Sequence, residues 1–334
     1  MTGDDQRDES TQSAPDAPPS KGDVLRTAVD LAGHAPSLYN AQPWSWEISD
    51  ERADLFLDVT QSFPVADPDL REARIGCGAA LHHLQVAVTA AGWGHESQLS
   101  SGLQDRLLAQ VRLTDPIDAD PAALRLVQAI ALRHNDRRPF STELISAEVL
   151  GALQTSVDEG GVHLQIVSHD EHRIWLSVLA ERAALLQSAR EGYSEELARV
   201  TGTDGDSTIL ADEIPHVVSP RHTDVTLRDF ELLAPGTLGI PESAEEHPVW
   251  CVLWTDDDGP LDWLEAGRGL SRLLLDAASR GLATGIQSQP VEVAMIRAQI
   301  NEHLLSGLGH AQVLVRIGWP GTPNVPAGVD AQQG

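Results

Sequence analysis

Apolar residues recur every three or four positions in several stretches of this chain, which is the spacing of a helix that buries one face. The predicted helices cover residues 23–33, 78–91, 121–132, 147–157 and 270–279. Asp23 is the expected N-terminal cap of the first helix, and Gly92 and Gly281 follow the second and the last.

Alternating apolar and polar residues, the pattern of a half-buried strand, occupy other stretches. The predicted strands cover residues 44–48, 55–59, 162–167 and 249–254. A polar turn over 49–53 would join the first two strands into a hairpin, and residues 312–320 read as a further strand that ends in a turn.

Parts of this pattern occur twice, in the same order along the chain. Residues 25–33 match residues 153–161 at a Leu, a Thr, a Val, an Asp and the closing Gly. The helix that ends before Gly92 likewise parallels the helix that ends before Gly281, with leucines at matching positions. These repeats predict two related halves, 23–124 and 125–320.

Three stretches are polar and lack the large apolar side chains that a fold buries. We expect residues 1–22 to form a disordered acidic leader and residues 321–334 a tail, because burial cannot offset the entropy of ordering them. Residues 201–247 form a long polar connection, which is either a lid or a disordered segment.

Composition indicates a globular protein with a sizeable core, since 41% of its 334 residues are hydrophobic. The net charge of -27 repels nucleic acids and anionic membrane surfaces, so we expect neither as a partner. Cys77 and Cys251 do not imply a disulfide framework, and no signal peptide or membrane span is evident, which favours a cytoplasmic protein. His82 and His83 are adjacent and point to different parts of a helix, so no metal site is predicted.

Residues 35–44, Ala-Pro-Ser-Leu-Tyr-Asn-Ala-Gln-Pro-Trp, join a turn rich in helix breakers to the start of a strand. The short polar side chains of Ser37, Asn40 and Gln42 suit a loop that grips a ligand. The same residues also suit an ordinary helix end and turn, and Trp44 would then be a core position of a plain strand.

Residues 133–140, Arg-His-Asn-Asp-Arg-Arg-Pro-Phe, concentrate positive charge in an acidic protein. A turn that holds Arg133, Asn135 and Arg137 at alternate positions would aim two guanidinium groups and an amide at one anion, and phosphate suits that geometry. Alternatively, these arginines pair with nearby carboxylates on a solvated face.

Residues 280–290 run from a helix end into a loop with Gly285 and Pro290, and by themselves indicate an ordinary helix cap. Further on, Arg316 interrupts the apolar strand over 312–320. A buried arginine needs an anionic partner, which makes it a second candidate phosphate ligand.

These segments together resemble the nitroreductase family, and the layout from residue 23 to residue 320 most resembles its Acg-like branch. The resemblance implies an α+β nitroreductase-like fold in which a single chain forms an intramolecular pseudo-dimer of two related halves. Ordinary nitroreductases build each flavin site across two subunits, whereas here one chain supplies the Pro-Ser-x-x-Asn loop and the arginine motif. The second half lacks such a loop after Gly161, so the resemblance implies one noncovalent FMN per chain and a monomer.

The same resemblance assigns roles to particular residues. Asn135 stands where the family has Ser or Thr, and its amide can still donate to a phosphate oxygen. Arg137 would reach the pyrimidine edge of the flavin, where a positive charge favours the reduced ring. The implied FMN contacts are Ser37, Asn40, Gln42, Arg133, Asn135, Arg137, Leu282, Ala283, Thr284, Gln287 and Arg316.

The implied activity is an FMN-dependent oxidoreductase that takes hydride from NAD(P)H and then passes it to a small nitro or quinone-type acceptor. No catalytic acid or base is predicted, because the flavin carries the chemistry. Two alternatives remain: a protein that binds or sequesters FMN with little turnover, which a lid over 201–247 would favour, and an interaction module with a decayed site.

Overall fold

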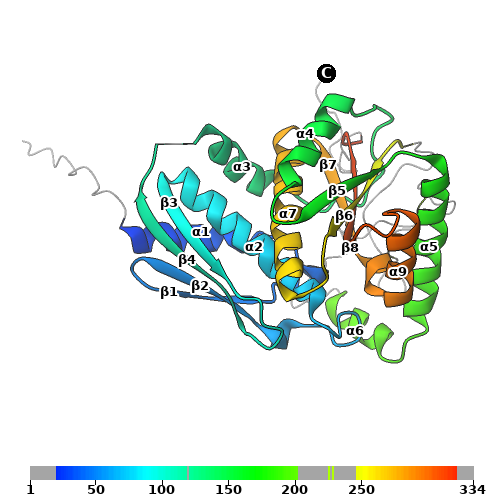
Figure 1. Cartoon of the computed structure of the whole chain (residues 1–334), viewed down its shortest axis with the longest axis horizontal. Coiled ribbons are helices and arrows are strands. Elements are labelled where there is room, and N and C mark those ends of the chain that lie inside the picture. The colour runs from blue at the N-terminus through cyan, green and yellow to red at the C-terminus, as the bar shows by residue number, and fades with distance from the viewer. Residues whose placement is uncertain (1–19, 119, 202–224, 226–227, 229–245, 322–334) are drawn as a thin grey trace, which may run out of the picture.

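The computed structural model describes residues 20–118, 120–201, 225, 228 and 246–321. Within this part of the chain, two four-stranded antiparallel sheets flank a central pair of long helices (Figure 1). Residues 1–19 of the predicted leader, residues 322–334 of the tail and nearly all of the segment 201–247 lie outside the described residues. The last residues of the predicted leader are ordered, contrary to the prediction, because Ser20 caps a helix that begins at Lys21. None of the described helices is long and apolar enough to cross a membrane.

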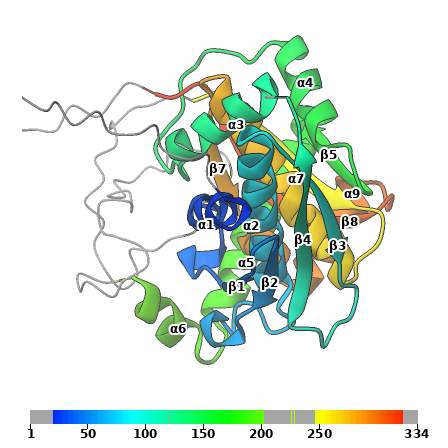
Figure 2. The same ribbon diagram turned by 90° about the vertical axis from the view of Figure 1, so that its left-hand side faces the viewer.

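The first half is built from one sheet and the two helices that pack beside it. Helix α1 lies next to α2 in both views of the molecule (Figures 1 and 2). Its elements are α1 (Lys21–Ala32), a 3-10 turn (Leu38–Asn40), β1 (Trp44–Ile48), β2 (Arg52–Leu57), a second 3-10 turn (Val59–Gln61), α2 (Arg71–Ala90), β3 (Trp93–Leu99) and β4 (Leu107–Pro116).

Helix α3 (Pro121–Leu132) follows and packs against both α2 and α7, so it belongs equally to either half. The remaining elements form the second half. They are α4 (Ala147–Val157), β5 (Val162–Val167), α5 (Asp170–Ser188), α6 (Tyr193–Val200), β6 (Val249–Thr255), α7 (Pro260–Ser279), β7 (Ala283–Gln287), α8 (Gln289–Glu292), α9 (Ala294–His303) and β8 (His310–Gly318).

The two halves share one topology. The first sheet has the strand order β1-β2-β4-β3 and the second has β5-β6-β8-β7, so each strand has a counterpart in the same position. In both halves a long core helix, α2 or α7, connects the second strand to the third. The α+β pseudo-dimer expected from the repeat is therefore confirmed, while the division at residues 124 and 125 stays a prediction.

Helices α2 and α7 cross at a pair of glycines that occupy equivalent positions. A Cβ at Gly78 would lie 2.9 Å from the carbonyl carbon of Leu264, and a Cβ at Gly267 would lie 2.8 Å from that of Ile75. Only glycine permits this approach of two helix backbones. The close crossing holds the two halves together and brings their loops to one side.

Several boundaries differ from the prediction. Helix α1 begins at Lys21 because the side chain of Ser20, rather than that of Asp23, caps it, and Asp23 closes the capping box from the third position. Helix α2 begins at Arg71, well before Gly78, and α7 begins at Pro260. The first turn of α2 is charged and carries no apolar periodicity.

Other elements were not predicted at all, or were predicted as loops. Strand β3 is exposed along much of its length, and α5 has polar residues among its apolar ones, so neither shows a clean period. Residues 283–287 form strand β7 rather than the expected loop, because β8 pairs with them along their whole length. Elements β4, α6, α8 and α9 were also missed.

Candidate functional site

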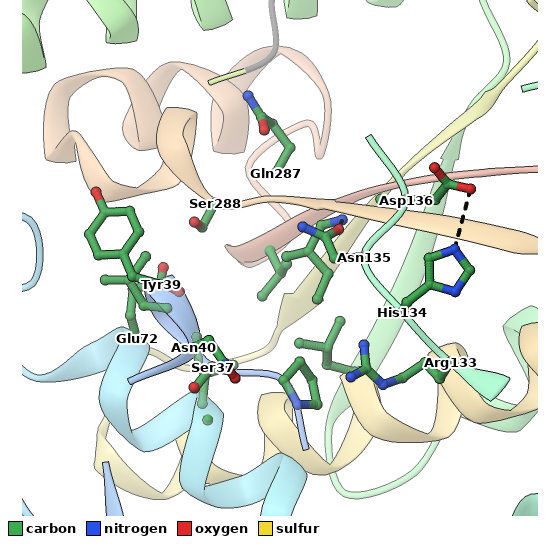
Figure 3. Close-up of a pocket in the computed structure, with 18 of the residues that line it drawn as sticks. Ser37, Tyr39, Asn40, Glu72, Arg133, His134, Asn135, Asp136, Gln287 and Ser288 are labelled. Atoms are coloured by element: carbon green, nitrogen blue, oxygen red, sulfur yellow. Dashed lines mark hydrogen bonds and ion pairs between the residues drawn. The ribbon is translucent and has the colours of Figure 1, made fainter. Parts of the chain in front are cut away.

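A cavity of about 640 Å³ opens where the two halves meet (Figure 3). Its walls come from the loop between α1 and β1, the first turns of α2, the segment after α3, and strands β7 and β8. This volume is within the range of cofactor and small-molecule sites. The predicted residues that line it are Ser37, Asn40, Gln42, Arg133, Asn135, Arg137, Gln287 and Arg316.

Leu282, Ala283 and Thr284, which the resemblance implied as FMN contacts, are not among the residues that line this cavity. Leu282 packs in the apolar core beneath β7. The carbonyl of Thr284 accepts a hydrogen bond from the backbone N–H of Asp136 at 2.8 Å. The part of this segment that faces the cavity is Gly285, Ile286 and Gln287, together with Ser288.

The loop after α1 has an unusual backbone. Tyr39, Asn40 and Gln42 have φ values of 52°, 56° and 51°, a region that costs residues other than glycine free energy. The Oγ of Ser37 accepts a hydrogen bond from the backbone N–H of Gln42 at 2.9 Å and so closes the loop on itself. Strained backbone of this kind clusters at binding sites, where the surrounding fold maintains it.

Arg133 brings a positive charge to the cavity without a matching negative charge. Its Nη2 donates to the carbonyl of His34 at 3.1 Å, but its buried Nε has no hydrogen-bond partner. Within the described ranges, no carboxylate lies within ion-pair distance of it. Burial lowers the pKa of Arg133, which shows that its charge is poorly solvated. An anionic ligand would meet both needs.

Arg138, in the same segment, has its own partner. Its Nε and Nη2 donate to the Asp136 carboxylate at 2.9 and 2.7 Å, and His134 is 3.4 Å from that carboxylate. Burial opposes the charge on Asp136, yet the hydrogen bonds from His134 and Arg138 outweigh it and hold the pKa of Asp136 well below its ordinary value. The pairing alternative is therefore right for Arg138 and does not apply to Arg133.

Asn135 positions the opposite wall of the cavity. Its Oδ1 accepts a hydrogen bond from the backbone N–H of Ile286 at 2.7 Å, which ties the arginine segment to β7. Its amide Nδ2 makes no hydrogen bond to the described residues and is available to a ligand.

Arg316 has an anionic partner within the protein. Its side chain is 1% exposed, and its Nη1 lies 3.2 Å from the carboxylate of Glu246. Its Nη2 donates to the carbonyls of Asp136 at 3.0 Å and Arg138 at 2.7 Å. The charge that made Arg316 a candidate phosphate ligand is thus balanced by Glu246, and its hydrogen bonds hold the arginine segment against β8.

Sequence reasoning missed a second group of polar residues at the cavity, far from Arg133 in Figure 3. Tyr39, Glu72 and Arg228 line this side. Arg228 donates to the hydroxyl of Tyr39 and pairs with the carboxylate of Glu292. Burial raises the pKa of Tyr39 well above its ordinary value despite the nearby Arg228.

Glu72 is also strongly perturbed by its surroundings. Its side chain is 7% exposed and it forms an ion pair with Arg71. Burial raises the pKa of Glu72 to about 8, and the Glu292 and Asp67 carboxylates add to that rise while Arg71 opposes it. Its adjacency to Arg71 was the only signal in the sequence, and an adjacent Arg and Glu are common on exposed helices.

Comparison with known proteins finds relatives of this chain in Mycobacterium tuberculosis. Acg of Mycobacterium tuberculosis strain H37Rv is 34% identical over 318 residues, which cover 91% of this chain and 94% of Acg. Rv3131 of the same strain is 29% identical over 300 residues, which cover 89% of this chain and 85% of Rv3131. The names of both proteins assign them to the NAD(P)H nitroreductases. No family model matches the chain.

Solved structures show a partial likeness. A nitroreductase with bound FMN from Bacteroides fragilis aligns with a TM-score of 0.37 and 14% identity, over 61% of this chain and 96% of the other. An NADPH:FMN oxidoreductase from Vibrio harveyi, complexed with NAD+, aligns with a TM-score of 0.33 and 15% identity, over 63% of this chain and 76% of the other.

Proposed function

This chain belongs to the family of NAD(P)H nitroreductases that includes Acg, and on that premise we propose that it is an FMN-dependent oxidoreductase. The observation that carries the proposal is the half-buried guanidinium of Arg133, which faces the cavity and has no carboxylate partner among the described residues. A phosphate monoester supplies the charge and the hydrogen-bond acceptors that this group lacks.

The residues at the cavity fit FMN in both size and charge. We assign the phosphate to Arg133 and to the free amide of Asn135, and the flavin ring to the strained loop that carries Ser37, Asn40 and Gln42. When bound, FMN would supply the redox chemistry, since it takes hydride from NAD(P)H and passes it to an acceptor.

The chain itself contributes position and charge. The closed loop that contains Ser37 is fixed before any ligand binds, which lowers the entropy cost of binding. We assign Arg137 to the ring, where its charge favours reduction. We assign Arg316 to holding the arginine segment in place, because Glu246 already balances its charge.

Two substrates would use the cavity in turn. We propose that NAD(P)H binds first and leaves after reduction, and that a small nitro or quinone-type acceptor then takes its place. One FMN per chain follows from the single loop and the single arginine segment, and each comes from a different half of the same chain.

Absorbance spectroscopy of the purified protein tests this function directly. The protein is first titrated with FMN, and the complex is then mixed with NADPH or NADH in the absence of oxygen. We expect one FMN per chain, bleaching of the flavin band by the nucleotide, and recovery of the band after addition of a quinone or nitroaromatic. Bound FMN that stays oxidised with either nucleotide would favour sequestration instead, and a protein that takes up no FMN would refute the proposal.

A further inference from the structure

A group of buried charges lies at and behind the wall of the cavity on the side away from Arg133, and two of its members, Glu72 and Arg228, line the cavity. It comprises Arg71 and Glu72 in the first turn of α2, Asp67 before that helix, Glu292 of α8, and Arg228. Figure 3 shows Glu72 beneath Tyr39, with Arg133 on the other side of the cavity. All these side chains are nearly excluded from water: Arg71 and Glu72 are 8% and 7% exposed, and Arg228 and Glu292 are 6% and 0% exposed.

The charges in this group do not cancel. It contains two guanidinium groups and three carboxyl groups, and the nearest further pair, Arg297 with Asp258, is neutral overall. An excess negative charge in a buried place is costly, because neither water nor a counterion stabilises it. Closely spaced carboxyl groups therefore share a proton at neutral pH.

Hydrogen bonding decides which carboxyl keeps that proton. Glu292 accepts from Arg228, from Gln187 at 2.6 Å and from Ser288 at 2.6 Å, and these donors favour its charged form. Asp67 accepts from two backbone N–H groups, those of Glu72 at 3.0 Å and of Ala73 at 2.9 Å.

Glu72 accepts from a single donor within the part of the chain that the structure describes. That donor is Nη2 of Arg71, which is shared with the carbonyl of Val291, while Nη1 of Arg71 donates to Gln312. Of the three carboxyl groups, Glu72 alone lines the cavity. The carboxyl group with the fewest hydrogen-bond donors among the described residues is therefore the one that a bound molecule can reach.

We propose that Glu72 is a catalytic acid, which gives its proton to the electron acceptor bound in this cavity. The inference rests on the proposed function. The O–H bond of Glu72 breaks and an O–H bond forms on the acceptor, which also receives a hydride from the reduced cofactor. One hydride and one proton convert a quinone into a hydroquinone, or a nitro group into a nitroso group and water. Arg71 stabilises the carboxylate that remains until it takes a proton from solvent.

Infrared spectroscopy of the protein without cofactor tests whether Glu72 holds a proton. We expect the wild type at neutral pH to show the carbonyl band of a protonated carboxyl group, and Glu72→Gln to lose it. Glu265→Gln is the matched control, because Glu265 is also largely buried and paired with an arginine, Arg268, but lies outside the cavity. The same spectrum in wild type and Glu72→Gln would overturn the proposal.

Stopped-flow kinetics of the loaded enzyme tests whether that proton is used. In Glu72→Gln we expect reduction by NAD(P)H to persist, while reoxidation by a quinone slows at least about 100-fold, the lower end of general acid catalysis. In wild type, reoxidation should slow as pH rises through the pKa of Glu72, and this dependence should vanish in the variant. An unchanged rate and pH profile would contradict the assignment.

A further variant guards against loss of folding, since Glu72→Gln leaves Arg71 buried without its partner. Glu72→Asp keeps an acid and should keep the pH dependence at a lower rate, whereas a pH-independent rate in this variant would refute the proposal. A chain that binds no FMN would refute the proposed function, and the infrared measurement would still decide whether Glu72 is protonated.

Discussion

An Arg133→Met substitution is expected to weaken FMN binding while leaving the cofactor-free protein at least as stable as the wild type. A charge-assisted hydrogen bond to phosphate contributes about 1.5–3 kcal/mol, and about 1.4 kcal/mol corresponds to a tenfold change in Kd. Loss of the Arg133 guanidinium should therefore raise the Kd for FMN about 10- to 150-fold.

The stability of the cofactor-free protein follows from the contacts of the same side chain. The buried Nε of Arg133 lacks a partner, and such a donor costs about 1–3 kcal/mol. Methionine removes that cost and fills similar space, while the bond from Nη2 to the carbonyl of His34, worth about 1 kcal/mol, is lost. The net change in the free energy of unfolding is thus between zero and a gain of about 2 kcal/mol.

Arg138→Met is the matched control, because this arginine lies in the same segment and is paired with Asp136. The Asp136 side chain is 4% exposed and would lose two charge-assisted hydrogen bonds. Breaking a fully buried pair costs about 3–5 kcal/mol, and about 1–3 kcal/mol is expected here because the Arg138 side chain is 32% exposed.

Urea unfolding followed by circular dichroism gives the stabilities of the proteins without cofactor, and isothermal titration calorimetry gives Kd for FMN. Relative to the wild type, we expect the free energy of unfolding to stay the same or rise in Arg133→Met and to fall in Arg138→Met. If Arg133→Met is destabilised as much as Arg138→Met and binds FMN as tightly as the wild type, Arg133 is not an unpaired anion ligand.

Two further predictions concern the seam between the halves and the pH dependence of stability. Gly267→Ala should lower the free energy of unfolding by about 2–3 kcal/mol, because the added Cβ would press on the backbone of Ile75. The control, Gly151→Ala, adds a Cβ in open space and should raise the free energy of unfolding by about 0.5–1 kcal/mol. Equal urea midpoints for the two variants would contradict the close crossing. The pKa of Asp136 lies well below its ordinary value of 3.8, so its charge contributes stability that is fully present above that pH and declines as the pH falls below it. The difference between the free energies of unfolding of wild type and Asp136→Asn, measured from about pH 7 to about pH 2, should therefore shrink toward the acid end.

The sequence predicted those elements whose burial is local and periodic. Helices α3 and α4 have the predicted bounds, because each has a polar cap, Asp120 or Ser146, ahead of a clear apolar face. The first turns of α2 were missed since Arg71, Glu72 and Arg74 are charged there and yet buried. Their burial depends on partners more than 25 residues away, such as Gln312 for Arg71 and Leu103 for Arg74, which no local pattern reveals.

The residues of the candidate site also divide into those that a local sequence pattern predicted and those that it did not. Its arginine segment and its loop stand out because each concentrates unusual residues within ten positions, and the structure places most of them at one cavity. The proposed role of Glu72 could not be predicted from the sequence, because it depends on the charges of Glu292 and Arg228, which come from distant parts of the chain. The partner of Arg316 was predicted to be an external phosphate, and the structure supplies Glu246 in its place.

The shared topology of the two halves allows the ligand-facing loop of the first half to be compared with the equivalent place in the second half. In the second half, β5 begins directly after Gly161, where the first half continues from Gly33 into its ligand-facing loop. The place that such a loop would border is held by paired side chains: Glu159 meets Arg272 at 3.2 Å. Arg272 stands on α7 as His83 stands on α2, one position beyond the buried pair of His82 and Ser271. The two halves have sheets of the same strand order, and each contributes one helix to the crossing of α2 and α7. The loop after Gly33 in the first half, and the pairing of Arg272 with Glu159 in the second, decide which of the two equivalent places can hold a ligand. Both features favour one FMN per chain.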